Sequence, residues 1–213
     1  MGYALVVGIA AMLALFVGAY MFDIARAVRL ELPTRARTSL AEFVPGQSRQ
    51  VVGRVRSGVG ESLRSPLRGD ACVAYVVIVE TERIIGSMQG FSEIVRETKT
   101  VGFELEDGDA VVAVEPAGTH LSLTAGATIQ VDPYEALDDP QAALLARHGW
   151  EEGKYSRRTL RFTVCVLAPG MRVAVSGRAE PDDQGGLVFR HAPDCPLGLS
   201  NAAEDLSPPP TRV

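Results

Sequence analysis

Cysteine and histidine, the side chains that most often hold metals or act as nucleophiles and bases, are few in this chain and lie far apart. The chain has three of each, namely Cys72, Cys165, Cys195, His120, His148 and His191. A structural zinc site needs about four clustered nitrogen and sulfur ligands, and no two of these cysteines have the C-x-x-C spacing. His191 and Cys195, four residues apart, come nearest to such a pair. The sequence therefore predicts no metal site and no cofactor.

Acidic residues offer a second kind of chemistry. Glu104, Glu106, Asp107 and Asp109 lie close together in the sequence, and calcium prefers carboxylate oxygens. Their spacing is not that of an EF-hand loop, and they fall on a predicted strand and its turn, where solvent alone satisfies them. No serine lies in the G-x-S-x-G pattern of a hydrolase nucleophile. We therefore expect no catalytic residue.

The run SPLRGD, at residues 65–70, is the densest motif of the chain and precedes a long apolar segment. Pro66 fixes its own backbone φ and Gly69 permits a tight turn, so the motif favours a structural turn in front of a strand. The alternative is a rigid loop that binds a partner protein through Ser65, Pro66, Leu67 and Gly69. The sequence leaves this second interpretation open.

Three further side chains have reactive or amphipathic groups. We expect Cys72 to be a buried thiol with a raised pKa, because its strand neighbours are apolar. We expect Tyr75, on the same strand, to lie in the core with its hydroxyl at the edge. Trp150, the single tryptophan, either anchors a helical insertion on the barrel or is exposed to a partner, and the sequence does not decide between these.

The N-terminal segment indicates where this chemistry would take place. From Tyr3 to Phe22, twenty residues carry no charge, and a helix with a rise of about 1.5 Å per residue would then span the roughly 30 Å hydrocarbon core of a bilayer. No Lys or Arg precedes the segment and no cleavage site of small residues follows it, so we expect a retained transmembrane helix over 3–22. Ala10, Ala14 and Gly18 recur at every fourth position, a spacing that leaves open a homodimer through this helix.

A basic segment follows the predicted membrane helix. Residues 23–48 are expected to form a short juxtamembrane helix that ends before Pro33 and then a linker with one partial element near Leu40. The basic residues that flank the membrane are Arg26, Arg29, Arg35 and Arg37. Positive charge within about 15–20 residues of a membrane helix marks its cytoplasmic side. We therefore expect the N-terminus outside and the C-terminal domain in the cytoplasm, with anionic lipid headgroups attracted to the same arginines.

Residues 49–191 change to short β-rich runs separated by turn residues. The run at 71–82 is apolar on both faces and predicts a central strand. In the interruption at 134–148, Asp139 is a candidate N-cap with Pro140 at the first helical position. The other predicted strands are 51–55, 98–106, 110–115, 121–123, 128–131, 158–167, 172–179 and 187–190. The proline-rich tail, 192–213, is predicted to be disordered.

These elements predict a mainly β fold, specifically a small antiparallel, OB-like barrel with one helical insertion, preceded by a single N-terminal transmembrane helix. A barrel closes its own strand edges, which a domain crowded on a membrane needs. The net charge is −5, while nucleic-acid binding would require a Lys- and Arg-rich face. We therefore expect no nucleic acid among the partners.

Three parts of the domain resemble the GIDE domain family, also called beside-a-membrane (BAM). They are the segment from Gly53 through SPLRGDACVAY to Glu80, the segment VGFELEDGD at 101–109 with the valine-rich run after it, and the segment LAPGMRVAVSG at 167–177. The best-known members are membrane ubiquitin ligases of mitochondria and plastids, in which a C-terminal RING performs the reaction. The resemblance covers most of residues 50–191, and it implies a non-catalytic domain that contacts partner proteins beside a membrane.

The chain departs from that family pattern because no second apolar span and no RING are found in it. A RING binds two zinc ions through about eight Cys and His ligands, whereas this chain has six such residues in all. Ubiquitin transfer is therefore not carried over. Only two lysines, Lys99 and Lys154, occur among 21 basic residues, which suits a high-GC prokaryotic source, so we expect a RING-less version in a bacterial or archaeal cell membrane.

The function that the sequence favours is a single-pass membrane protein that presents a cytoplasmic GIDE-like domain as a protein-interaction module without catalysis. Its partners would be membrane lipids, through the anchor, and a protein of unknown identity. A first alternative is a non-catalytic subunit of a ubiquitin-ligase-like or protease-associated enzyme. A second is a sensor of lipids or small molecules beside the membrane.

Overall fold

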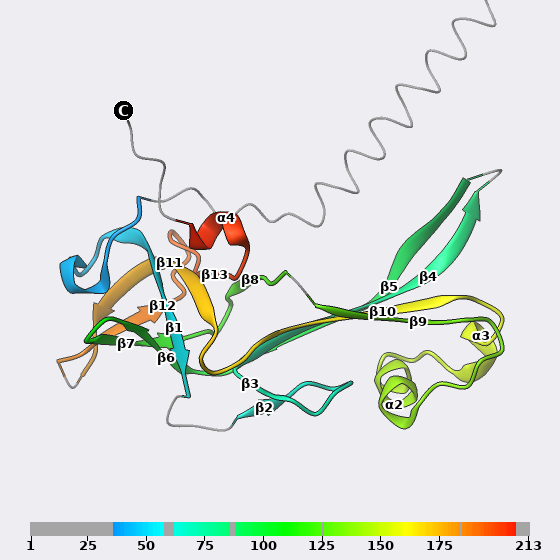
Figure 1. Cartoon of the computed structure of the whole chain (residues 1–213). Helices are drawn as coiled ribbons and strands as arrows, with labels where there is room; N and C mark the ends of the chain where they lie inside the picture. The colour runs from blue at the N-terminus through cyan, green and yellow to red at the C-terminus, as the bar shows by residue number, and fades with distance from the viewer. Residues whose placement is uncertain (1–35, 58–61, 86–87, 125, 184, 208–213) are drawn as a thin grey trace, which may run out of the picture. The chain divides into compact units, whose positions relative to one another are not determined.

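β-strands make up most of the computed structural model, which describes residues 36–57, 62–85, 88–124, 126–183 and 185–207 (Figure 1). All of these residues belong to one compact unit. The predicted transmembrane helix at 3–22 and most of the basic segment at 23–48 lie outside the described residues. Within the described ranges, no helix has the length and apolar character needed to cross a membrane.

Five strands close into a barrel. They are β1 (Ser48–Arg56), β6 (Phe103–Asp107), β7 (Ala110–Glu115), β11 (Arg172–Pro181) and β12 (Leu187–Arg190). Around the barrel the hydrogen-bonded order is β1-β6-β7-β12-β11 and back to β1. The prediction of a mainly β fold with a barrel is confirmed. The prediction that the barrel is antiparallel is wrong, because β7 and β12 run parallel. A closed ring with an odd number of strands cannot alternate in direction throughout, so at least one neighbouring pair has to be parallel.

Alternating apolar side chains fill the barrel. Val51 and Val55 on β1 point inward and are almost fully buried, as the period of two along a strand requires. Gly53 lies between them on the same face, where an added Cβ would approach the backbone oxygen of Glu106 to 2.4 Å. Glycine therefore stands at Gly53 because β1 and β6 come too close there for a side chain.

Segments on both sides of the predicted domain also belong to the barrel. Before β1, the short helix η1 (Leu40–Glu42) buries Leu40, which confirms the predicted partial element. Phe43, directly after it, packs edge-on against Phe189 of β12, with ring centroids 5.2 Å apart. The barrel domain therefore begins before the predicted boundary at residue 49.

The prediction of a disordered tail from residue 192 is wrong for residues 192–207. This part of the chain contains β13 (Gly198–Ser200) and the helix α4 (Ala203–Leu206). Leu197 and Leu199 are fully buried in the barrel core, and β13 pairs with β11. Burial of these two leucine side chains in the barrel core stabilises an ordered segment despite the proline-rich composition around it. Residues 208–213 lie outside the described residues.

A second, four-stranded sheet has the order β5-β4-β10-β9. Its strands are β4 (Ala74–Ile85), β5 (Met88–Thr100), β9 (Ala127–Val131) and β10 (Leu160–Leu167). The prediction of a central strand is confirmed for β4, which lies between β5 and β10. The single strand predicted at 98–106 is wrong, because the chain leaves this sheet after Thr100 and enters the barrel at Phe103. Three shorter strands, β2 (Leu63–Arg64), β3 (Ala71–Cys72) and β8 (His120–Ser122), complete the described strands.

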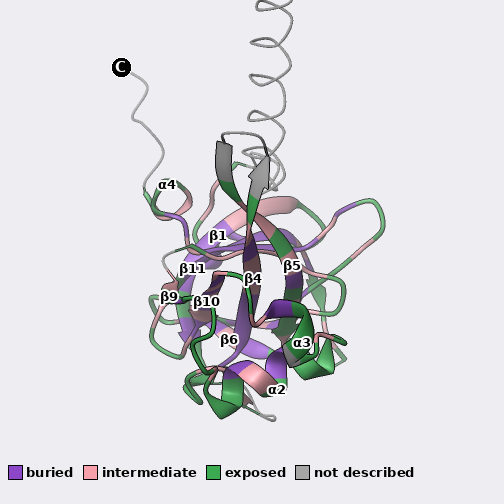
Figure 2. Ribbon diagram, turned by 90° about the vertical axis from the view of Figure 1, so that its right-hand side faces the viewer, coloured by how far each residue is buried: buried purple, intermediate pink, exposed green. Residues whose placement is uncertain are grey.

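The helices α2 (Asp139–Arg147) and α3 (Glu152–Tyr155) form the predicted insertion, between β9 and β10. Leu144 and Leu145 of α2 are fully buried against the apolar face of the four-stranded sheet. In Figure 2, β4 is coloured largely as buried, while much of α2 and α3 is exposed. Trp150 is partly buried against this second core. The anchoring of the insertion on the barrel is therefore wrong, because Trp150 packs on the four-stranded sheet, and full exposure to a partner is wrong as well.

Candidate functional site

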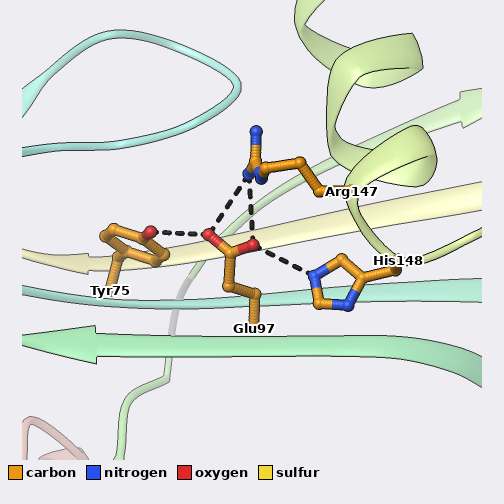
Figure 3. Close-up of polar contacts among 4 residues, drawn as sticks. All are labelled: Tyr75, Glu97, Arg147 and His148. Atoms are coloured by element: carbon orange, nitrogen blue, oxygen red, sulfur yellow. Dashed lines mark hydrogen bonds and ion pairs between the residues drawn. The ribbon is translucent and has the colours of Figure 1, made fainter.

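Four polar side chains from two strands and a helix meet at the carboxyl end of α2 (Figure 3). Tyr75 comes from β4, Glu97 from β5, and Arg147 and His148 from the last residue of α2 and its C-cap. We call these four residues the Glu97 cluster, because all of its contacts converge on that carboxylate. The cluster brings together titratable side chains from three distant parts of the sequence.

The ends of α2 place Arg147 and His148. Asp138, one residue before the predicted N-cap Asp139, caps the helix in a capping box with Gln141. At the other end, Gly149 has φ +73, and its N–H donates to the oxygen of Ala146. The N–H of Trp150 reaches the oxygen of Leu145, which completes a Schellman motif. The helix thus ends with Arg147 in its last turn, where the helix dipole favours a cation, and with His148 as its C-cap.

The strand register places the other two residues. Tyr75 lies opposite Lys99, and Glu97 lies opposite Val77. Because directly paired residues share a face, Tyr75 and Glu97 are diagonal neighbours on the face that packs against α2. The Tyr75 hydroxyl donates to Glu97 Oε1 at 2.6 Å.

Two contacts from α2 complete the cluster. Arg147 donates from Nη2 to both carboxylate oxygens of Glu97, at 3.3 and 3.1 Å, and His148 Nε2 lies 3.0 Å from Oε2. The Glu97 side chain is only 11 % exposed, against 49 % for Arg147 and 33 % for His148.

The charge of Glu97 is held by these neighbours. Burial by itself would raise the pKa of this carboxyl, but hydrogen bonds from Tyr75, His148 and Arg147 and the positive charge of Arg147 lower the pKa to about 2. The pKa of the Tyr75 hydroxyl is raised, first by burial and then by its hydrogen bond to the carboxylate. At neutral pH, therefore, Glu97 is ionised and Tyr75 is protonated.

The geometry of the Glu97 cluster favours a structural role over a catalytic one. A carboxylate has about four lone-pair positions, and four contacts already occupy those of Glu97. With its pKa near 2, Glu97 is also a weak base at neutral pH. Cys72, a candidate nucleophile by residue type, is 1 % exposed, and burial raises the pKa of its thiol, as predicted. The cluster is therefore suited to fastening α2 to the sheet.

The SPLRGD motif forms the turn between β2 and β3. The N–H of Ser65 donates to the oxygen of Asp70, and the N–H of Gly69 to the oxygen of Ser65. Gly69 has φ +71, which explains the glycine, and Leu67 packs against the second core. These contacts agree with the structural interpretation of Ser65, Pro66, Leu67 and Gly69. The turn ends five residues before Tyr75 in the chain, but none of its own residues belongs to the Glu97 cluster.

The other residues considered from the sequence are used within the fold. Glu104 and Glu106 lie near Arg56, and Asp107 accepts the N–H of Leu40 at 2.9 Å. Cys195 Sγ lies 3.4 Å from Ser48 Oγ. The three cysteines are free thiols and all are buried. Across the described residues, no group of three or more His, Cys, Asp or Glu side chains could hold a metal ion.

Of the four arginines expected beside the membrane, Arg26, Arg29 and Arg35 lie outside the described residues, and Arg37 is described. Arg37 donates from Nη1 to the oxygens of Leu206 and Ser207, at 3.5 and 2.5 Å. This places the start of the described chain beside the carboxyl end of α4. A basic side chain at a helix carboxyl end is favourable, so Arg37 has a structural partner.

Sequence reasoning identified Tyr75 as a core residue but did not find the cluster that it joins. The available signals were local ones. Arg147, His148 and Gly149 mark the end of a helix, and Glu97 is a charged residue two positions after Val95 in a β-rich run. The pairing of these two signals depends on β4–β5 register and on how α2 docks, neither of which has a periodic signature in the sequence. Comparison with protein-family models, with curated proteins and with solved structures finds no match for this chain.

Proposed function

We propose that this chain is a single-pass membrane protein that presents a cytoplasmic, GIDE-like β domain as a protein-interaction module without a catalytic role of its own. The uncharged segment Tyr3–Phe22 supports the anchor, because its twenty residues match the thickness of a bilayer core. The arginines after it support a cytoplasmic domain, by the preference of positive flanks for that side. The order of motifs along residues 50–191 supports the GIDE-like assignment.

The barrel itself is proposed to be OB-like. Support comes from the order of its strands around the ring. The first three barrel strands along the chain, β1, β6 and β7, pair in that order. The fourth barrel strand, β11, returns to pair with β1. This is the Greek-key order 4-1-2-3, and a five-stranded Greek-key barrel is the architecture of the OB fold.

The observation that carries the proposal is the open, four-stranded sheet, whose strands are inserted between the barrel strands in the sequence. The chain leaves the barrel once between β1 and β6, to form β4 and β5, and again between β7 and β11, to form β9 and β10. Among the described strands, β5 and β9 are each paired along one edge only. β5 is thirteen residues long. An exposed sheet edge accepts an extended segment of another protein through main-chain hydrogen bonds.

Charge argues for protein over nucleic acid as the partner. OB-like barrels often bind oligonucleotides, but from residue 100 to residue 146 this chain contains no lysine or arginine. That stretch includes β6 and β7 of the barrel and the edge strand β9. Phosphate contacts need Lys and Arg, so a protein partner suits these surfaces better.

Photo-crosslinking tests the proposal in cells that express the full chain. A photoreactive residue is placed at Thr98 on β5, at Gln130 on β9, or at Val111 on the barrel strand β7, all three exposed. We expect adducts with a second protein in the membrane fraction from one or both edge strands and not from Val111. Absence of adducts from both edges, or the same adducts from Val111, would refute an interaction module of this kind. Identification of an enzyme as the stoichiometric partner would favour the enzyme-subunit alternative.

A further inference from the structure

The short loop after β9 has a tyrosine where its backbone favours glycine. Residues 132–135 form a turn in which the N–H of Glu135 donates to the oxygen of Asp132. Pro133 is the second residue of this turn and Tyr134, with φ +67, is the third. A proline followed by a residue of positive φ is the pattern of a type II turn, whose third position favours glycine or asparagine. A bulky residue in this backbone region is a genuine outlier.

Nothing in the packing of the Tyr134 side chain offsets this strain. Its side chain is exposed, and the residue as a whole is 77 % exposed, the largest value among the exposed large hydrophobic residues of the described chain. The backbone is fixed by other means. The N–H of Tyr134 donates to the oxygen of Ser156 at 2.7 Å, and Glu135 Oε2 accepts the N–H of Asp132 at 3.1 Å. The loop thus holds an aromatic side chain in solvent at a backbone cost of about 1–3 kcal/mol, and strain of this kind clusters at functional sites.

The same region offers an unpaired strand edge. β9 pairs with β10 on one side only, and it is an outer strand of its sheet (Figure 1). Thr128, Ile129 and Gln130 are all exposed. Ile129 is 37 % exposed and, with Tyr134, makes up two of the four exposed large hydrophobic residues that the described chain contains. We call β9 together with the turn at 132–135 the β9 surface.

The charge of the β9 surface is negative. Residues 127–139 contain four carboxylates, at Asp132, Glu135, Asp138 and Asp139, and no lysine or arginine. Asp138 caps α2, whereas Asp132, Glu135 and Asp139 are exposed. Nearby basic residues are Arg157 and Arg158, which follow Ser156 and are exposed, and Arg161 of β10, which lies opposite Gln130 but pairs with Glu80. The strand β9 itself is uncharged, and the turn that holds Tyr134 is acidic through Asp132 and Glu135.

We propose that the β9 surface binds an extended, basic segment of a partner protein, which adds as a strand to β9 and packs an apolar side chain against Tyr134. Strand addition supplies main-chain hydrogen bonds that do not depend on sequence, and the flanking side chains supply selectivity. Tyrosine is enriched among the residues that supply most of the binding energy in protein interfaces. The carboxylates of the adjoining turn favour a partner segment rich in Lys or Arg. This inference rests on the proposed function as an interaction module and names its partner's chemistry.

The test uses the purified full chain in detergent and two blocked, fluorescent peptides of about nine residues, the length of a long strand. One alternates Lys with Val and the other alternates Glu with Val. We expect the basic peptide to bind, as followed by fluorescence anisotropy, and to slow amide hydrogen exchange at residues 127–131. The acidic peptide should not bind in the same range. Equal binding of the two peptides, no binding up to about 1 mM, or binding without protection of β9 would overturn the proposal.

Three variants separate binding from folding. Tyr134→Gly removes the ring and relieves the strained backbone, so it should weaken basic-peptide binding by about tenfold or more without lowering the melting temperature. Ile129→Thr keeps a β-branched residue in the strand and should also weaken binding. Val111→Thr makes the same kind of change at an exposed valine of the barrel and should bind like the unchanged chain. Unchanged binding by Tyr134→Gly would overturn the proposal.

The two levels of the proposal fail in different ways. If the peptide experiments fail but crosslinked adducts still form from Thr98 on β5, the interaction module stands and the β9 surface is not its docking site. If no crosslink forms from either edge strand, the proposed function itself fails.

Discussion

Tyr75 and Glu97, which stand diagonally across the β4–β5 pair, share a 2.6 Å hydrogen bond directly beneath the carboxyl end of α2. The carboxylate also contacts Arg147 and His148, so a single buried charge joins two strands and the helix. Removal of one member of such a group leaves its buried partners unsatisfied, which costs more than the hydrogen bond itself. The cluster therefore attaches the helical insertion to the sheet together with the buried side chains of Leu144 and Leu145.

Replacement of Glu97 tests this attachment. Glu97→Gln keeps the shape of the side chain but loses its charge and two of its acceptor positions, and we expect the free energy of unfolding to fall by about 1–3 kcal/mol. Denaturation of the full chain in detergent, followed by the fluorescence of the single tryptophan, Trp150, measures this value. Glu115→Gln removes an exposed carboxylate paired with Arg190 and should cost much less. Equal losses in the two variants would show that the Glu97 cluster has no special role.

Acid should weaken the same attachment in a defined pH range. The pKa of Glu97 is lowered from 4.5 to about 2 in the folded chain, so this group stabilises the fold at pH values above its unfolded pKa. The contribution, as much as about 3 kcal/mol, should disappear as the pH falls from about 4.5 toward about 2. Unfolding experiments between pH 7 and pH 2 would measure this loss. In Glu97→Gln the slope over that range should be shallower, and an unchanged slope would contradict the assigned cause.

Two glycines in strands should respond differently to an added methyl group. At Gly53 a Cβ would lie 2.4 Å from the backbone oxygen of Glu106, whereas at Gly90, in β5, nothing lies within 4 Å. Gly53→Ala has to separate β1 from β6 and should lower the free energy of unfolding by about 1–3 kcal/mol. Gly90→Ala should be neutral or slightly stabilising, because alanine loses less backbone entropy on folding. Similar melting temperatures for both variants would mean that β1 and β6 are less closely packed than described.

Metal chelation should leave the fold intact. The barrel rests on apolar side chains such as Leu105 and Val175, each fully buried and each contributing about 1.5–3 kcal/mol. A domain folded around zinc would instead lose its folding free energy with the metal. We therefore expect the melting temperature to be the same with and without EDTA, and elemental analysis to find no stoichiometric zinc. One or more zinc ions per chain, with a lower melting temperature in EDTA, would contradict the non-catalytic proposal.

Membrane orientation can be tested with reporters fused to the full chain. A reporter that is active only in the cytoplasm should be active when it follows Val213, and one that is active only outside should be active before Met1. The reason is the arginine-rich flank on the C-terminal side of the uncharged segment. The opposite pattern of activity would contradict the predicted orientation. Recovery of the chain in the soluble fraction would contradict the predicted membrane anchor.

By itself, the sequence determined the elements whose signals are local. The alternation along 110–115 predicted β7, the two apolar faces of 71–82 predicted a central strand, and Pro140 with Gly149 predicted α2. Each of these signals is written in neighbouring residues, because side-chain period and turn chemistry act over a few positions.

Only the tertiary structure decided which strands meet. The parallel pair of β7 and β12 follows from closing five strands into a ring, and the division between β5 and β6 follows from the two sheets that they join. Leu197 and Leu199 are ordered because the barrel core, made mostly by distant residues, has room for them. The Glu97 cluster and the strained exposure of Tyr134 likewise depend on contacts with residues far along the chain. Pairing of this kind depends on complementary surfaces and long-range register, for which a single sequence carries no period.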